Sequence, residues 1–154
     1  MLIPTLKKFG VGILNPLDKS ILTQHHNSEL VIDNRLKAIE EGNDVEYAEL
    51  MKDVVRADLA MLDKSDFLVV YVDKDVHMCG TYYEIAIATQ QRKPILVVCK
   101  QGRYNVSPWI WGVVPKEMIF GSFDEMEKYL KNIDDSQTKL KRWRFFDVSK
   151  YYGN

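Results

Sequence analysis

The feature that most constrains the fold is a pair of short apolar runs with a helical segment between them. The runs, residues 67–73 (FLVVYVD) and 94–100 (PILVVCK), are rich in β-branched residues and have the length of strands buried on both faces. Residues 81–91, between them, are predicted to form a helix. Because parallel strands need a crossover of this kind, the pattern predicts a parallel sheet covered by helices.

The rest of the chain continues this alternation. Ser28, Asn43 and Asp44 are candidate helix caps, Gly42 is a candidate helix terminator, and S-F-D-E from Ser122 has the pattern of a capping box. We therefore predict strands at 9–17 and 118–120, and helices at 28–41, 45–64 and 122–133.

A doubly wound sheet normally begins with a strand that becomes central, whereas this chain opens on what reads as the end of a helix (LIPTLKKFG). The predicted fold class is α/β: a three-layer sandwich with a flavodoxin-like, doubly wound, mostly parallel sheet that lacks the usual first strand.

Length and charge limit the function classes. The 154 residues fit one domain, 1–154, with an aromatic and basic tail at 139–154 that we expect to pack on the domain or on a neighbouring subunit. The net charge of −1 gives no basic field for nucleic acid. No apolar run approaches the length of a membrane-spanning helix. We expect a cytoplasmic protein with no nucleic-acid or membrane partner.

Two carboxylates break the surrounding pattern. At 100° per residue, Asp58 lies at the centre of an apolar stripe of the predicted helix at 45–64, which contains Met51, Val54, Val55, Met61 and Leu62. A carboxylate there is costly unless it is paired, hydrogen-bonded or exposed to a cleft. Glu84 follows the strand at 67–73, and ligands of open parallel sheets gather beyond strand carboxyl ends. Both have structural alternatives: a hydrogen bond to a loop or a stripe that ends at the domain edge for Asp58, and a Thr81–Glu84 capping box for Glu84.

Other polar and aromatic residues have weaker claims. His25 and His26 are adjacent on a predicted loop, so a solvated loop is favoured over a metal site. His77 and Cys79 lie near Glu84. For His77, a loop position without a functional role is favoured, and no arrangement of partner residues supports cysteine catalysis by Cys79. Cys79 and Cys99 are expected to be reduced thiols. Trp109 and Trp111 suit either stacking on a base or packing at a subunit interface.

The stretch DLAMLDKSDFLVVYVDKDVHMCGTYYEIAIATQQRKPILVV, residues 58–98, resembles the nucleoside 2-deoxyribosyltransferase family, which includes related nucleotide N-glycosidases. The likeness is carried by an acid on a helix, an Asp followed by a hydrophobic strand, a Gly-containing loop, an E-[IL]-[GA]-x-A helix and a K-P strand, with G-x-x-x-E spacing between the loop and the helix. The resemblance implies that Glu84 attacks C1′ of a 2′-deoxynucleoside to form a deoxyribosyl ester. Asp58, 26 residues earlier, would then contact the base and transfer protons.

The resemblance also implies the surroundings of the site. Gly80 matches the motif glycine, Asn105 is the candidate for a residue that completes a neighbouring subunit's site, and Trp111 is a candidate base contact. Six residues before the nucleophile, transferases carry an acid that holds the sugar and nucleotide-cleaving relatives a small hydroxyl residue. Met78 stands there, so Asp73 or Asp75 is the candidate substitute. We expect a homo-oligomer, dimer or higher, with sites near subunit interfaces, no metal and no cofactor.

Three functions follow as hypotheses. The first is transfer of 2-deoxyribose between nucleobases. The second is hydrolysis of a nucleoside or nucleotide with the same nucleophile. The third is a noncatalytic nucleotide-binding or oligomerising module, suggested by Met78 and by the missing strand, whose Tyr orients the nucleophile in family members.

Overall fold

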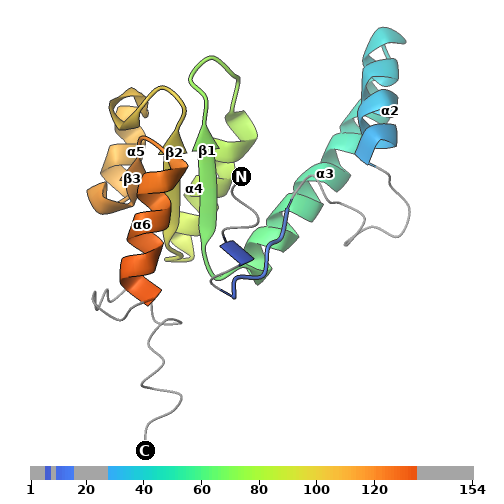
Figure 1. Ribbon diagram of the computed structural model, residues 1–154. Coiled ribbons are helices and arrows are strands. Elements are labelled where there is room, and N and C mark those ends of the chain that lie inside the picture. Colours follow the sequence, from blue (N-terminus) through green and yellow to red (C-terminus); the bar gives the residue numbers. More distant parts are fainter. Residues whose placement is uncertain (1–5, 8–9, 16–27, 135–154) are drawn as a thin grey trace, which may run out of the picture. The chain divides into compact units, whose positions relative to one another are not determined.

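The computed structural model describes residues 6–7, 10–15 and 28–134 (Figure 1). The chain divides into two compact units: one is Gly12–Ser65, and the other combines Met1–Val11 with Asp66–Asn154. The 139–154 tail and the pair His25 and His26 lie outside the described residues, and the single domain 1–154 stays a prediction.

The second of these units contains a three-stranded parallel sheet in the order β1-β2-β3. Its strands are β1 (Leu68–Val72), β2 (Ile95–Cys99) and β3 (Ile119–Phe120). Leu68 pairs with Ile95, and Val97 with Ile119. All five residues of the middle strand β2 are buried, as continuous apolar runs of parallel sheets predict. The three predicted strands at 67–73, 94–100 and 118–120 are confirmed within a residue.

Helices cover both faces of this sheet. Figure 1 shows α4 (Cys79–Gln90) behind the sheet and α6 (Phe123–Asp134) in front of it. In β1, Val70 and Val72 are buried, while Tyr71 alternates with them and stacks on Phe123 of α6 at 5.3 Å between ring centroids. The α/β, flavodoxin-like fold class is therefore confirmed.

Short elements connect β2 to β3. Two 3₁₀ helices, η2 (Arg103–Asn105) and η3 (Lys116–Met118), flank α5 (Pro108–Val113).

The predicted S-F-D-E capping box at the start of α6 is made in altered form. Ser122 Oγ accepts a hydrogen bond from Glu125 N at 3.3 Å, but the Glu125 carboxylate accepts from Gly121 N, one residue before the cap.

The predicted strand at 9–17 is wrong over its described part, because residues 10–15 form no strand. Leu6 and Lys7 are helical, and Gly10 has a φ of +71°. Gly10 N donates to Lys7 O and Val11 N to Leu6 O, the pattern by which a left-handed glycine ends a helix. The apolar run thus begins with a helix-ending turn, and among the described residues no strand precedes β1.

The Gly12–Ser65 unit contains two helices in contact, α2 (Ser28–Glu40) and α3 (Asp44–Lys64). Gly42, with a φ of +66°, turns the chain between them. Asn43 caps α3, since its side-chain oxygen accepts from Glu46 N at 3.2 Å. These helices, the terminator and this cap confirm the predictions. No helix of the described residues combines the length and apolar character needed to cross a bilayer.

Candidate active site at the carboxyl end of the sheet

Glu84 lies in the second turn of α4 and is half-buried. The predicted capping box with Thr81 is wrong, because α4 begins at Cys79 and its N-cap is Met78. Tyr82 N already donates to Met78 O, so Thr81 lies inside the first turn and cannot be the cap. The local structural explanation for this Thr–Glu spacing is therefore removed, and the catalytic role of Glu84 stays a prediction.

Asp58 lies on α3, in the Gly12–Ser65 unit, and is half-buried. The apolar stripe around it is real toward the carboxyl end of the helix, where Met61 and Leu62 are buried. Val55, predicted on the same stripe, is 43% exposed. The catalytic role of Asp58 also stays a prediction.

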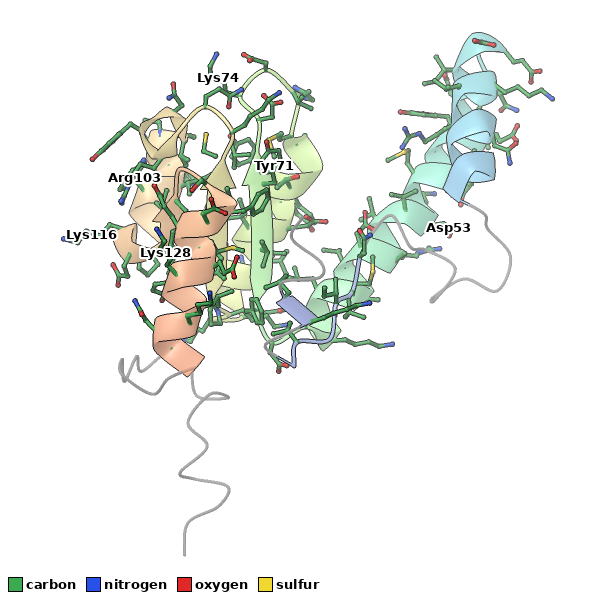
Figure 2. The ribbon with its side chains drawn as sticks, in the orientation of Figure 1. Asp53, Tyr71, Lys74, Arg103, Lys116 and Lys128 are labelled. Carbon is green, nitrogen blue, oxygen red and sulfur yellow. The ribbon has the colours of Figure 1, made fainter. Side chains whose placement is uncertain are left out.

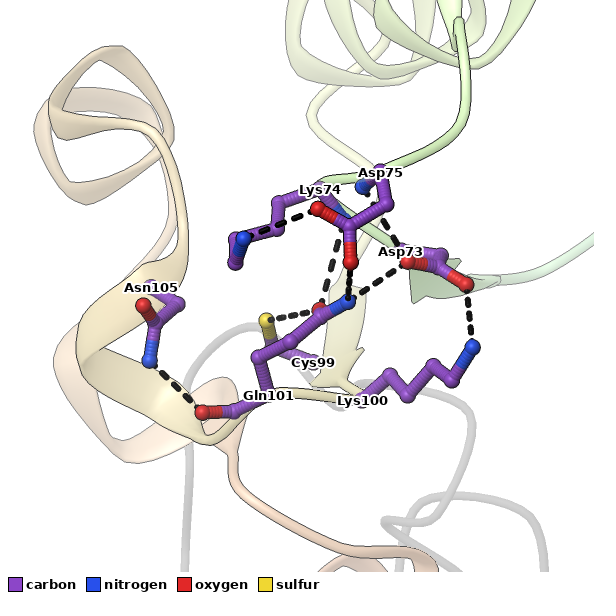
Figure 3. Close-up of polar contacts among 7 residues, drawn as sticks. All are labelled: Asp73, Lys74, Asp75, Cys99, Lys100, Gln101 and Asn105. Carbon is purple, nitrogen blue, oxygen red and sulfur yellow. Dashed lines mark hydrogen bonds and ion pairs between the residues drawn. The ribbon is translucent and has the colours of Figure 1, made fainter.

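A polar network joins the carboxyl ends of β1 and β2, centred on Gln101 (Figure 3). The Gln101 carboxamide nitrogen donates to Asp73 Oδ1 at 2.6 Å and to Asp75 Oδ2 at 3.2 Å. The Gln101 carboxamide oxygen accepts from Lys74 N at 3.3 Å. Lys100 Nζ contacts Asp73 Oδ2 at 2.7 Å. This edge is where parallel sheets bind ligands.

The network shifts the pKa values of its charged groups. Hydrogen bonds from Lys100, Gln101 and the Asp75 amide to the Asp73 carboxylate lower the pKa of Asp73 from 3.8 to about 2. The same contact with Asp73 raises the pKa of Lys100. Lys74, 2.8 Å from Asp75, lowers the pKa of that carboxyl. The side chains of the network that can ionise, Asp73, Lys74, Asp75 and Lys100, are therefore all charged at neutral pH.

Three predicted binding residues lie at or near this edge. Asp75 is exposed in the loop after β1, and Asn105 in η2 donates through its side chain to Gln101 O at 2.6 Å. The network thus brings Asp75 and Asn105 together around Gln101. Gly80 is the second residue of α4 and is exposed, and a Cβ built on it meets nothing within 4 Å. No steric constraint of the fold therefore requires glycine at position 80.

Trp111 forms an aromatic cluster with two residues that follow β2. Its ring stacks on Tyr104 at 6.1 Å between centroids, and the Arg103 guanidinium lies 5.3 Å from the Trp111 ring and 5.7 Å from the Tyr104 ring. Arg103, labelled in Figure 2, also donates to Lys116 O at 2.8 Å. Tyr104 is 85% exposed and Trp109 80%, whereas Trp111 is half-buried. Trp111 therefore packs within its own chain.

Sequence reasoning missed Gln101, Lys100 and Arg103 as parts of this edge. Their only signal was position, at or shortly after the end of a predicted buried strand. The described residues contain no group of His, Cys, Asp and Glu side chains that could hold a metal ion. Cys79 and Cys99 are both free thiols, as predicted, the first exposed and the second buried.

Comparison with models of protein families gives a match, whereas comparison with individual proteins does not. No curated protein and no solved structure matches the chain significantly. A family model for nucleoside 2-deoxyribosyltransferase matches residues 2–132. Since the match spans most of the 154 residues, from before the first described residue into α6, the chain belongs to the nucleoside 2-deoxyribosyltransferase family.

Proposed function

We propose that the protein transfers 2-deoxyribose between nucleobases through a covalent deoxyribosyl ester on Glu84. The observation that carries the proposal is the position of Glu84. It is half-buried in the second turn of the helix that follows the carboxyl end of β1. The resemblance to the family to which the chain belongs implies that Glu84 is the nucleophile.

The proposed reaction has two displacements at C1′. In the first, a Glu84 carboxylate oxygen bonds to C1′ while the N-glycosidic bond breaks, and the base leaves with the bonding electrons and takes a proton. In the second, a nitrogen of the incoming base bonds to C1′, that nitrogen loses its proton, and the ester oxygen leaves as the carboxylate. Dividing one displacement into two lowers each barrier.

The roles of the other residues rest on the family resemblance. Asp58 is proposed to donate the proton to the departing base and to accept one from the incoming base. Asp75 is the better candidate to hold a sugar hydroxyl, since its side chain is 66% exposed, whereas the side chain of Asp73 is 16% exposed. Asn105, Trp111 and Gly80 are proposed to line the substrate site.

The alternative that shares this chemistry ends with water. In that case the protein is a nucleoside or nucleotide N-glycosidase. Incubation with deoxyinosine, with and without adenine, separates the two: a transferase makes deoxyadenosine when adenine is present, and a hydrolase releases hypoxanthine and free deoxyribose in both mixtures. Repeating both mixtures with deoxyinosine 5′-phosphate tests whether a phosphate is required.

Replacing the proposed nucleophile is the sharpest test. We expect Glu84→Ala to lower turnover by about 10⁴-fold or more, because the replaced carboxylate forms the intermediate. Intact-mass measurement should show a deoxyribosyl adduct on the wild type incubated with substrate and none on Glu84→Ala. Glu117→Ala, at an exposed position in η3, is the control and should retain activity.

The noncatalytic alternative predicts another result. Wild type and Glu84→Ala would then be equally inert towards deoxynucleosides and deoxynucleotides, while one of these ligands still raised the melting temperature. That outcome would contradict the enzymatic proposal.

A further inference from the structure

Gln101 joins two loops that are distant in sequence. Its carboxamide nitrogen donates to Asp73 Oδ1 and Asp75 Oδ2, and its carboxamide oxygen accepts from Lys74 N (Figure 3). One side chain from the end of β2 thus contacts three consecutive residues after β1. We name these contacts the Gln101 clamp.

The chemistry of the clamp requires an amide. The contacts to Asp73 and Asp75 need an N–H donor, and the contact to Lys74 N needs an oxygen acceptor. A glutamate would supply the acceptor but would place a third carboxylate beside two others. A methionine has similar length but supplies neither a comparable donor nor a strong acceptor.

The clamp lies close to the start of α4. Only Val76, His77 and Met78 separate Asp75 from Cys79, the first residue of the helix. Met78 is the N-cap and makes no side-chain capping bond. The loop contacts made by Gln101 therefore help to set where α4 begins, and a helix carries that placement along its first turns to Glu84.

Gln101 also contacts the segment that follows β2, through its backbone oxygen. Asn105 Nδ2 donates to the backbone oxygen of Gln101 at 2.6 Å, and the neighbouring Lys100 is paired with Asp73 at 2.7 Å. The clamp thus connects the loop that leads to Glu84 with the segment that carries Asn105.

We propose that Gln101 is a positioning residue, whose carboxamide holds the 73–78 loop and thereby sets the placement of the Glu84 carboxylate against the substrate sugar. The inference rests on the proposed function of Glu84. It assigns Gln101 no contact with the substrate.

Amide hydrogen exchange tests the clamp independently of activity. In Gln101→Met, the amides of Lys74 and Asp75 should exchange faster than in the wild type, while the amide of Val97 in β2 should not change. Gln90→Met makes the same replacement at the exposed last residue of α4, and is the matched control. Unchanged exchange at Lys74 and Asp75 would overturn the clamp.

Deoxyribosyl transfer from deoxyinosine to adenine tests the positioning role. We expect Gln101→Met to lower kcat by about 10- to 100-fold with little change in KM, since a nucleophile displaced by about 1 Å loses much of its rate. Gln101→Glu should be impaired at least as much, although it keeps the length and the acceptor. A side chain that only filled space would be replaced well by either variant.

The outcomes separate the two proposals. A wild type with no turnover overturns the proposed function and the positioning role with it, and the exchange result still decides the clamp. An active wild type with an equally active Gln101→Met overturns the positioning role alone. If Gln101→Met does not fold, Gln101→Glu decides: wild-type kcat in that variant overturns the proposal.

Discussion

Asp73 accepts hydrogen bonds from three groups and forms an ion pair at the carboxyl end of β1. Lys100 and the Gln101 carboxamide bond its two oxygens at 2.7 and 2.6 Å, and Asp75 N approaches at 3.1 Å. Each of these contacts favours the charged carboxylate. Because its side chain is only 16% exposed, Asp73 acts as a structural anchor for the loop more than as a group offered to a ligand.

This environment predicts a measurable titration. The pKa of Asp73 is about 2 in the folded protein against the ordinary value of 3.8, so its contacts contribute stability that is present above about pH 4 and is lost as pH falls through about 2. The Asp73 carboxyl carbon, followed by NMR, should titrate near pH 2. Asp73→Asn should lose less stability than the wild type between pH 4 and 2 in urea unfolding.

Lys100 provides the comparison variant. Replacing its ammonium in Lys100→Met removes the largest contribution to the lowered pKa, so the Asp73 titration should move up toward 3.8. A wild-type Asp73 that already titrates near 3.8 would contradict the network as described.

At the scale of the elements, the turn between α2 and α3 depends on one residue. Gly42 has a φ of +66°, donates to Ile39 O and is followed by Asn43, which donates to Ala38 O. These bonds satisfy carbonyl groups at the end of α2, and the left-handed conformation they need favours glycine.

Gly42→Ala should therefore lower the free energy of unfolding by about 1 to 2 kcal/mol, because a Cβ is strained at this φ although nothing lies within 4 Å of it. Gly112→Ala is the control, since Gly112 lies in α5 without a left-handed φ and with open space around a Cβ. It should be neutral or stabilising by up to about 1 kcal/mol. Urea unfolding distinguishes them, and equal effects would contradict the assigned turn.

Elements could be predicted from the sequence where local chemistry decides them. Asn43 and Gly42 mark the boundaries of α3 and α2, and β-branched runs mark β1 and β2. The start of α4 could not be predicted, because T-x-x-E is a valid capping pattern whereas the structure starts the helix at Cys79, before Thr81. The strand at 9–17 failed for a similar reason: Gly10 ends a helix, which its apolar neighbours conceal.

At the scale of the whole molecule, contacts between side chains that are distant in the sequence could not be predicted from the sequence. Asp73 and Gln101 are 28 residues apart, and their contact depends on the parallel register of β1 and β2. The sequence placed Asp73 and Asp75 near the sheet edge, but only the register brings Gln101 to them. The family resemblance predicted roles for Glu84 and Asp58, but it predicted nothing about the Gln101 clamp.

The expected sharing of sites between subunits gives a further prediction. If Asn105 completes the site of a neighbouring subunit, then Glu84→Ala and Asn105→Ala chains, each inactive alone, should recover part of the transfer activity when co-assembled. A hybrid would contain one site with both residues intact. Co-assembly of Glu84→Ala with Glu84→Gln is the control, because neither chain can supply the carboxylate. Hybrids that form without recovering activity would contradict the sharing.

The parallel strand order also governs how the chain folds. The pairing of Leu68 with Ile95 joins residues that have 26 others between them, including α4, and the parallel addition of β3 requires a second crossover. The α2–α3 turn needs only neighbours in sequence. Because closing long loops slows folding, we expect the helical pair to form early and the sheet edge that carries the Gln101 clamp to be assembled late.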